Sequence, residues 1–412
     1  MDGEVEISTP DVSNRFFQWS FEGDVSTMSF IMAAERGGSS SGYFHASIEN
    51  LKKERGRNQA IAEADPLGVD AAIQALPALN DRADIAAIRD ITELAVTNVQ
   101  DAMRSDFVYA SAAIRDICMF GASLTRFNVE PSQCVPGFSK TLLGLAAGAE
   151  ATLPRDSFID YTSRNPDGDR ERRFSSQPEE EIFIDSLRQG MASLDYCLED
   201  LVLAYTYSFA EKEFATHCYT AADSFQTMID SIVKVKKKIT PEVFTHSIRP
   251  FFEPFAVDGV AYSAPSGAEM SILNVDLIIW GLECKDELYE KYVRANILRL
   301  PIIYQELCQQ FEGLPSMMSR MQERLLSDTP LNENEHNSVQ ALYHLLTKIY
   351  SFRMPHYKVA EDNVKLRLKE TGGAEVKGSG GFGIDEVKYV LDQTIKSRQL
   401  LLQLLPGVNA HR

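Results

Sequence analysis

One stretch near the C-terminus combines an imidazole, a guanidinium and a glycine-rich segment. His356 continues the apolar face of a predicted helix, and Arg353 lies three residues before it. On a helix surface this spacing lets Arg353 reach an anion beside whatever His356 binds. The segment Gly378–Gly383 (GSGGFG) offers many backbone donors and is flexible enough to close over a small molecule. The combination indicates a cofactor pocket with a cover.

The helix that carries His356 is predicted from its apolar periodicity. Large apolar residues recur there at steps of three and four, at Val339, Leu342, Leu346, Ile349 and Phe352. His356 falls one turn further along the same stripe, so its imidazole is expected to point into the core. A histidine on an apolar face is more often a hydrogen-bonded core residue than a ligand. Both interpretations stay open on position alone.

A second arginine also has the setting of a ligand-binding residue. Arg249 follows Phe244 on a predicted helix and stands directly before Pro250, in the run VFTHSIRPFFEP. Its guanidinium suits bidentate binding of a carboxylate. The alternative is an arginine at a helix C-terminus that binds the last carbonyls of its own helix.

The glycine segment also matches G-x-G-x-x-G, at Gly378, Gly380 and Gly383. A dinucleotide site requires a strand before this motif and a βαβ unit around it. Here TGGAEVK precedes the motif and the surroundings are helical, so a nucleotide-binding fold is rejected.

Net charge, cysteine spacing and the N-terminal sequence indicate which partners and which cellular location to expect. The 412 residues carry a net charge of −18, which speaks against nucleic acid and anionic membranes as partners. Six cysteines are scattered without zinc-ligand spacing and are expected to be reduced thiols. The start MDGEVEIS lacks the basic and apolar regions of a signal peptide, and the apolar segment Ile272–Leu282 is short and contains Asp276. A cytoplasmic protein is expected.

Helical patterns dominate from Asp65 onward and predict an all-α fold, a large helical bundle with a smaller N-terminal helical portion. We expect a polar N-terminal arm over residues 1–60, the smaller portion over 61–170 and the main helical domain over 171–412. The stretch around Asp258-Gly259 is the exception and predicts a small hairpin or an ordered loop. Leu288–Cys308 is predicted as one helix with Pro301 inside it.

Several separated blocks resemble known proteins. The order R-x-x-H at the end of a long helix, then GSGG, then another helix resembles the C-terminal part of the indoleamine and tryptophan 2,3-dioxygenase superfamily. FRMPHYKVAE and GSGGFG are more similar still to the monodechloroaminopyrrolnitrin synthase family. Further blocks extend the resemblance over residues 65–406, among them FVYASAAIRDI, EPSQCVPG, YTSRNP, IRPFFEP and APSGAEM. Two differences lie beside the expected substrate: a longer spacer after His356, and Val364 where that family has a tyrosine.

The resemblance implies haem b as cofactor, in a bundle similar to that of indoleamine 2,3-dioxygenase, and dioxygen or hydrogen peroxide as oxidant. It implies these site residues: His356 as proximal ligand of the haem iron; Arg353 near a propionate; Ser266 and Gly267 at the distal haem edge; Phe244 and Arg249 against the substrate; Ser379 and Gly380 in the lid. It assigns no catalytic residue. His217, His246 and His344 are alternative metal ligands, but no H-x-D/E spacing supplies a non-haem iron triad, so one axial histidine is the simpler account.

The implied substrate is tryptophan or a chlorotryptophan-like aromatic amino acid, whose indole ring would be oxidised and rearranged in secondary metabolism related to pyrrolnitrin. The alternatives are a tryptophan 2,3-dioxygenase that yields N-formylkynurenine and a haem-binding protein without turnover. A homodimer is an open alternative to a monomer.

Overall fold

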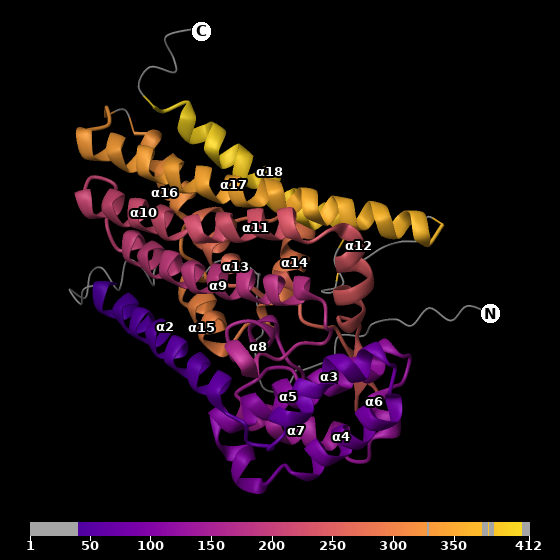
Figure 1. The fold of residues 1–412 in the computed structure, drawn as a ribbon. Coiled ribbons are helices and arrows are strands. Elements are labelled where there is room, and N and C mark those ends of the chain that lie inside the picture. The colour runs from indigo at the N-terminus through magenta and orange to yellow at the C-terminus, as the bar shows by residue number, and fades with distance from the viewer. Residues whose placement is uncertain (1–39, 328, 373–377, 379–382, 406–412) are drawn as a thin grey trace.

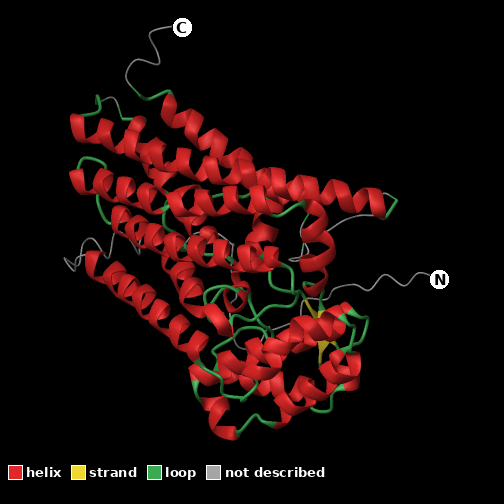
Figure 2. Cartoon of the chain, in the orientation of Figure 1, coloured by secondary structure: helices red, strands yellow, loops and turns green. Residues whose placement is uncertain are grey.

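The computed structural model describes residues 40–327, 329–372, 378 and 383–405. Nearly all regular structure in this part of the chain is helical, as Figure 2 shows, which confirms the all-α prediction. The strands β1 (Phe255–Val257) and β2 (Val260–Tyr262) pair antiparallel, with Ala256 opposite Ala261. They meet at Asp258-Gly259, so the hairpin alternative is the correct one. Both turn residues have positive φ, 52° and 78°, and glycine adopts this conformation readily.

The N-terminal helices gather at one end of the molecule (Figure 1). These elements are α3 (Asp70–Asp81), α4 (Ile85–Thr97), η1 (Asp101–Ser105), α5 (Phe107–Arg126), α6 (Pro131–Cys134) and α7 (Phe138–Gly148). α5 passes through their centre and is buried along most of its length. It is long and apolar enough to cross a membrane, but 83% of its apolar window is buried inside the protein, as in the core helix of a soluble protein.

Helix α2 (Ser40–Glu63) runs along the side of the molecule and joins this end to the bundle. It packs against α5, α9 and α15, and Phe44, Ile48 and Leu51 lie in the core. Most of α2 falls within the segment expected as a polar arm, so this part of the arm is a packed helix. The division at residues 60 and 170 stays a prediction.

Helices that lie side by side form the main bundle. They are α9 (Pro178–Tyr205), α10 (Lys212–Ser224), α11 (Gln226–Lys238), α17 (Glu333–Glu370) and α18 (Ile384–Leu402). α9 packs against α10 and α11, and α17 packs against α10, α11 and α18. The predicted stripe on α17 is confirmed, because Val339, Leu342 and Leu346 are fully buried. Asn332 and Glu335 form a capping box that begins this helix.

Shorter elements fill the space beneath the bundle. They are α8 (Phe158–Tyr161), η2 (Gly168–Arg170), α12 (Pro241–Val243), η3 (Phe244–Ile248), η4 (Arg249–Phe251), η5 (Gly267–Glu269), α13 (Ile272–Asp276), η6 (Leu277–Gly281), α14 (Glu287–Ile297), α15 (Ile302–Phe311) and α16 (Met317–Leu325). η3 and η6 are π-helical turns, a feature common near functional sites.

The prediction of one helix over Leu288–Cys308 is wrong. The chain breaks between α14 and α15, and Pro301 stands at the N-cap of α15. Proline cannot donate a backbone hydrogen bond inside a helix, so a new helix begins after it.

Candidate functional site

A large cavity of about 380 Å³ opens between the bundle and the shorter elements. Its volume lies in the range of about 300–1,000 Å³ that holds small molecules and cofactors. The walls come from α9, α11, η3, the loop 263–270, α13, α14, α17 and α18. Apolar side chains such as Phe158, Phe183, Met228 and Val235 make up most of the surface. A few charged and polar side chains also line the cavity, among them Arg249, Arg353 and His356.

His356 lines this cavity from α17. Its ring stacks on Phe352, one turn earlier, with the ring centroids 5.6 Å apart. Burial, together with the positive charge of Arg353, lowers the pKa of His356 to about 4. The imidazole is therefore neutral at physiological pH, and a neutral imidazole is the form that binds a metal. The side chain is half-buried because it borders the open space.

Arg353 lines the same cavity but is held by the protein. Its guanidinium is ion-paired with Asp276, and Nη1 donates to the carbonyl of Val390 at 3.1 Å and to Thr394 Oγ1. Both members of the ion pair are almost fully buried. These contacts fix α17 to α13 and α18 one turn before His356. An approach of Arg353 to a propionate stays a prediction.

Arg249 and Phe244 lie together on another wall, on η4 and η3. The ring of Phe244 packs edge-on against Phe183, with centroids 5.6 Å apart. Arg249 is buried, and Nη1 donates to the carbonyl of Phe252 at 2.6 Å and to Glu253 at 2.8 Å. The contact with a nearby carbonyl agrees with the structural interpretation of this arginine, and binding of a ligand carboxylate stays a prediction. Burial lowers the pKa of Arg249, and the carboxylate of Glu253 beside it acts in the opposite direction.

Ser266 and Gly267 form part of the loop wall. Ser266 Oγ accepts a hydrogen bond from the backbone of Ala268 at 3.2 Å, which begins η5. A Cβ built on Gly267 meets no atom within 4 Å, so open space lies beside this residue.

Two arginines, the buried Arg155 and the mostly buried Arg299, hold this loop at a second, small cavity of about 60 Å³. Arg299 pairs with Glu269, and Glu269 also accepts from the backbone of Phe158 at 2.8 Å. Arg155 donates to the carbonyl of Tyr262 at 2.9 Å and covers the Phe255 ring at 3.8 Å. Burial raises the pKa of Glu269 to about 7. The loop wall is thus held in place by charged groups outside the main cavity.

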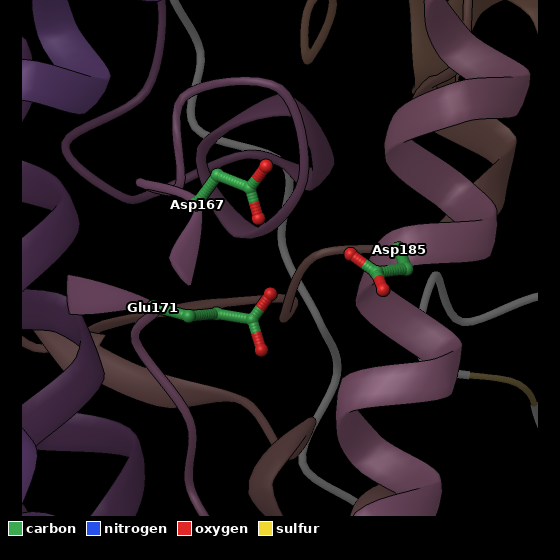
Figure 3. Close-up of side chains that lie close together, drawn as sticks. All are labelled: Asp167, Glu171 and Asp185. Carbon is green, nitrogen blue, oxygen red and sulfur yellow. The ribbon is translucent and has the colours of Figure 1, made fainter. Parts of the chain in front are cut away.

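A separate acidic cluster has the composition of a cation site. Asp167, Glu171 and Asp185 bring their carboxylates within 4.8 Å of one another and face a common space (Figure 3). Arg188 pairs with each of the three carboxylates, at 3.3, 3.0 and 2.8 Å respectively. We therefore interpret the cluster as a structural ion-pair network.

The cavity brings together all six predicted site residues within the described part of the chain. They are Phe244, Arg249, Ser266, Gly267, Arg353 and His356. Ser379 and Gly380 lie outside the described residues, although Gly378 and Gly383 on either side of them border the cavity. Sequence reasoning missed Asp276 and Tyr292 as lining residues. A carboxylate in the apolar segment Ile272–Leu282 was the signal that could have revealed Asp276.

The fold and site define a helical protein with a mainly apolar cavity, bordered by the neutral imidazole of His356 and the buried guanidinium groups of Arg249 and Arg353. The comparison with known families narrows this class. Residues 58–381 match the family model of monodechloroaminopyrrolnitrin synthase PrnB, and the chain belongs to that family. This is a family of oxidative enzymes of pyrrolnitrin biosynthesis that act on a tryptophan-derived substrate, so the chain is an enzyme of the oxidative type.

Proposed function

We propose that the protein is a haem-dependent oxidative enzyme that acts on tryptophan or a chlorotryptophan-like amino acid and rearranges its indole ring. One observation carries the proposal: the residues expected to bind cofactor and substrate, far apart in sequence, border a single cavity. Family membership supports the substrate class.

The residues present fit a haem. His356 offers a neutral imidazole, and haem iron is commonly held by one proximal histidine. The apolar walls suit a porphyrin, and the space beside Gly267 is open. Arg249, Arg367 and Lys236 also border the cavity, so cations are present for the propionates or for a substrate carboxylate. Bound haem would supply the redox-active iron needed to use dioxygen or hydrogen peroxide.

The chain's own residues would bind and orient the substrate. The guanidinium of Arg249 pairs with Glu253 through Nη1 and would hold the amino-acid carboxylate with its remaining N–H donors, since a guanidinium offers five donors in a planar fork. Phe244 and Phe183 provide aromatic surface against which an indole ring can pack. The Glu269–Arg299 pair keeps the opposite loop wall in position and so maintains the shape of the cavity.

The test is an absorption spectrum of the purified protein after haem reconstitution, with and without L-tryptophan and 7-chlorotryptophan. We expect stoichiometric haem and a Soret band that shifts with one of these ligands. Product mass then separates ring opening, in which two oxygen atoms are gained, from rearrangement with loss of the carboxylate. Absence of stoichiometric haem would overturn the proposal, and haem without any substrate-induced shift would favour a non-catalytic haem protein.

A further inference from the structure

A chain of aromatic rings leads from the cavity toward the surface. Tyr292 on α14 borders the cavity, and its ring centroid lies 6.3 Å from that of Tyr289, one turn earlier. Tyr289 in turn lies 4.8 Å from Trp280 on η6 and 5.8 Å from Tyr389 on α18. Trp280 and Tyr389 are half-buried, so both branches reach the outside. Each step is short enough for an electron to pass between neighbouring rings.

The hydroxyl group of Tyr289 has no evident structural role. The side chain is 2% exposed, and its Oη finds no hydrogen-bond partner among the described residues. A Cβ built on Gly281 would lie 2.4 Å from this oxygen, so the glycine leaves room for the hydroxyl. A buried polar group without a partner costs free energy, which a phenylalanine would avoid. The hydroxyl group does, however, make the ring of tyrosine much easier to oxidise by one electron than the ring of phenylalanine.

Trp280 has an acceptor for its indole proton. Its Nε1 donates to Asp276 Oδ1 at 3.2 Å, and Asp276 is almost fully buried and borders the cavity. The other oxygen of this carboxylate pairs with Arg353, so the role of Asp276 toward the indole is to accept the N–H proton when the ring is oxidised to a neutral indolyl radical.

We propose that Tyr292, Tyr289, Trp280 and Tyr389 form a relay that carries single electrons from the surface to the cavity. That hydrogen peroxide is the oxidant of this relay in the cell rests on the proposed function. When hydrogen peroxide reacts in the cavity without substrate, two phenols each give up one electron and one proton, and the peroxide becomes two water molecules. A one-electron reductant such as ascorbate then returns one electron and one proton to each phenoxyl radical at the surface. The relay thus reduces oxidising species in the cavity that would otherwise oxidise the residues of the site.

The relay can be tested on the full chain without haem, because the chain has only two tryptophans, Trp19 and Trp280. In the Trp19→Phe variant, azidyl radicals from pulse radiolysis oxidise Trp280, giving azide, an indolyl radical and a proton. The indolyl radical then takes one electron and one proton from a phenol. We expect its absorption to decay as phenoxyl absorption grows, at a first-order rate independent of protein concentration. Adding Tyr289→Phe should slow this transfer at least tenfold.

Tyr350→Phe is the matched control, since the ring of Tyr350, on α17, packs under Arg398 of α18 and is not part of the relay. An unchanged rate in Tyr289→Phe, an equal loss in Tyr350→Phe or a concentration-dependent rate would each overturn the relay. Circular dichroism checks that Tyr289→Phe is folded. If it is not, the double variant Tyr292→Phe/Tyr389→Phe provides the test. The radical should then stay on the buried Tyr289, so ascorbate should reduce the phenoxyl radical at least threefold more slowly than in the parent, and an unchanged rate would refute the relay. Failure to bind haem would refute the proposed function but leave these measurements intact.

Discussion

Arg353 and His356 lie one helical turn apart on α17 and border the same cavity, but their side chains have different partners. The guanidinium of Arg353 is bound to Asp276, Val390 and Thr394, whereas the imidazole of His356 stacks on Phe352 and faces the open space. The fixed arginine holds α17 in place, and its positive charge adds to burial, the larger cause, in lowering the pKa of the nearby imidazole. This division of roles leads to the following predictions.

Replacing His356 by alanine should abolish stoichiometric haem binding and leave the helical fold intact, because the imidazole contributes to the cavity wall and not to the packed stripe. Haem titration followed at the Soret band measures this, with circular dichroism for the fold. His344→Ala, on the same helix, should bind haem normally. A normal Soret band in His356→Ala would contradict the assignment of the proximal ligand.

Replacing Arg249 by alanine should preserve haem binding and weaken binding of L-tryptophan by about 10- to 150-fold. A hydrogen bond to a charged group contributes about 1.5–3 kcal/mol, which corresponds to this range. Spectroscopic titration gives the dissociation constants. Tryptamine, which lacks the carboxylate, is the control and should bind both proteins equally. Equal affinity of both proteins for L-tryptophan would refute the carboxylate role.

The stability of the apoprotein should fall between pH 6.5 and about 4, in part because of His356. The folded state lowers the pKa of this imidazole from 6.5 to about 4, so within this window the unfolded state binds more protons and acid favours unfolding. His356→Gln removes this contribution. Urea unfolding at pH 7 and pH 5 should show a smaller loss of stability in the variant than in the parent. An identical pH dependence in the two proteins would argue against a neutral, buried imidazole.

Asp276→Asn should lower the free energy of unfolding by about 3–5 kcal/mol, because it leaves the buried guanidinium of Arg353 without its counter-charge. Chemical denaturation measures the change. Glu49→Gln is the control, since Glu49 pairs with Lys52 at an exposed site and should leave the free energy of unfolding nearly unchanged. A loss below about 1 kcal/mol in Asp276→Asn would mean that Arg353 finds another partner.

Much of the fold could be predicted from local patterns. The stripe on α17, the hairpin at Asp258-Gly259 and the helical class follow from periodicity and turn chemistry, which act between neighbouring residues. The break at Pro301 was missed because apolar residues continue on both sides of the proline. The spacing of apolar residues carries no information about the backbone N–H group that a proline lacks.

The site was predictable only in part, for a related reason. His356, Arg353 and Arg249 stood out by residue type and spacing, and family resemblance supplied their common cavity. Asp276 is 77 residues from Arg353 in sequence, and only tertiary packing brings the two charges together. Likewise, no local pattern could show that the hydroxyl of Tyr289 is buried without a partner.

The π-helical turn η3 stands directly before Arg249, and a π-helical turn holds one residue more than the corresponding α-helical turn. Deleting a residue from an ordinary α-helical turn would rotate everything after it by about 100° about the helix axis. Deleting a single residue from 244–248 would instead restore α-helical hydrogen bonding and leave Arg249 in its present direction. The segment before this arginine can therefore lose one codon without turning the guanidinium away from the cavity.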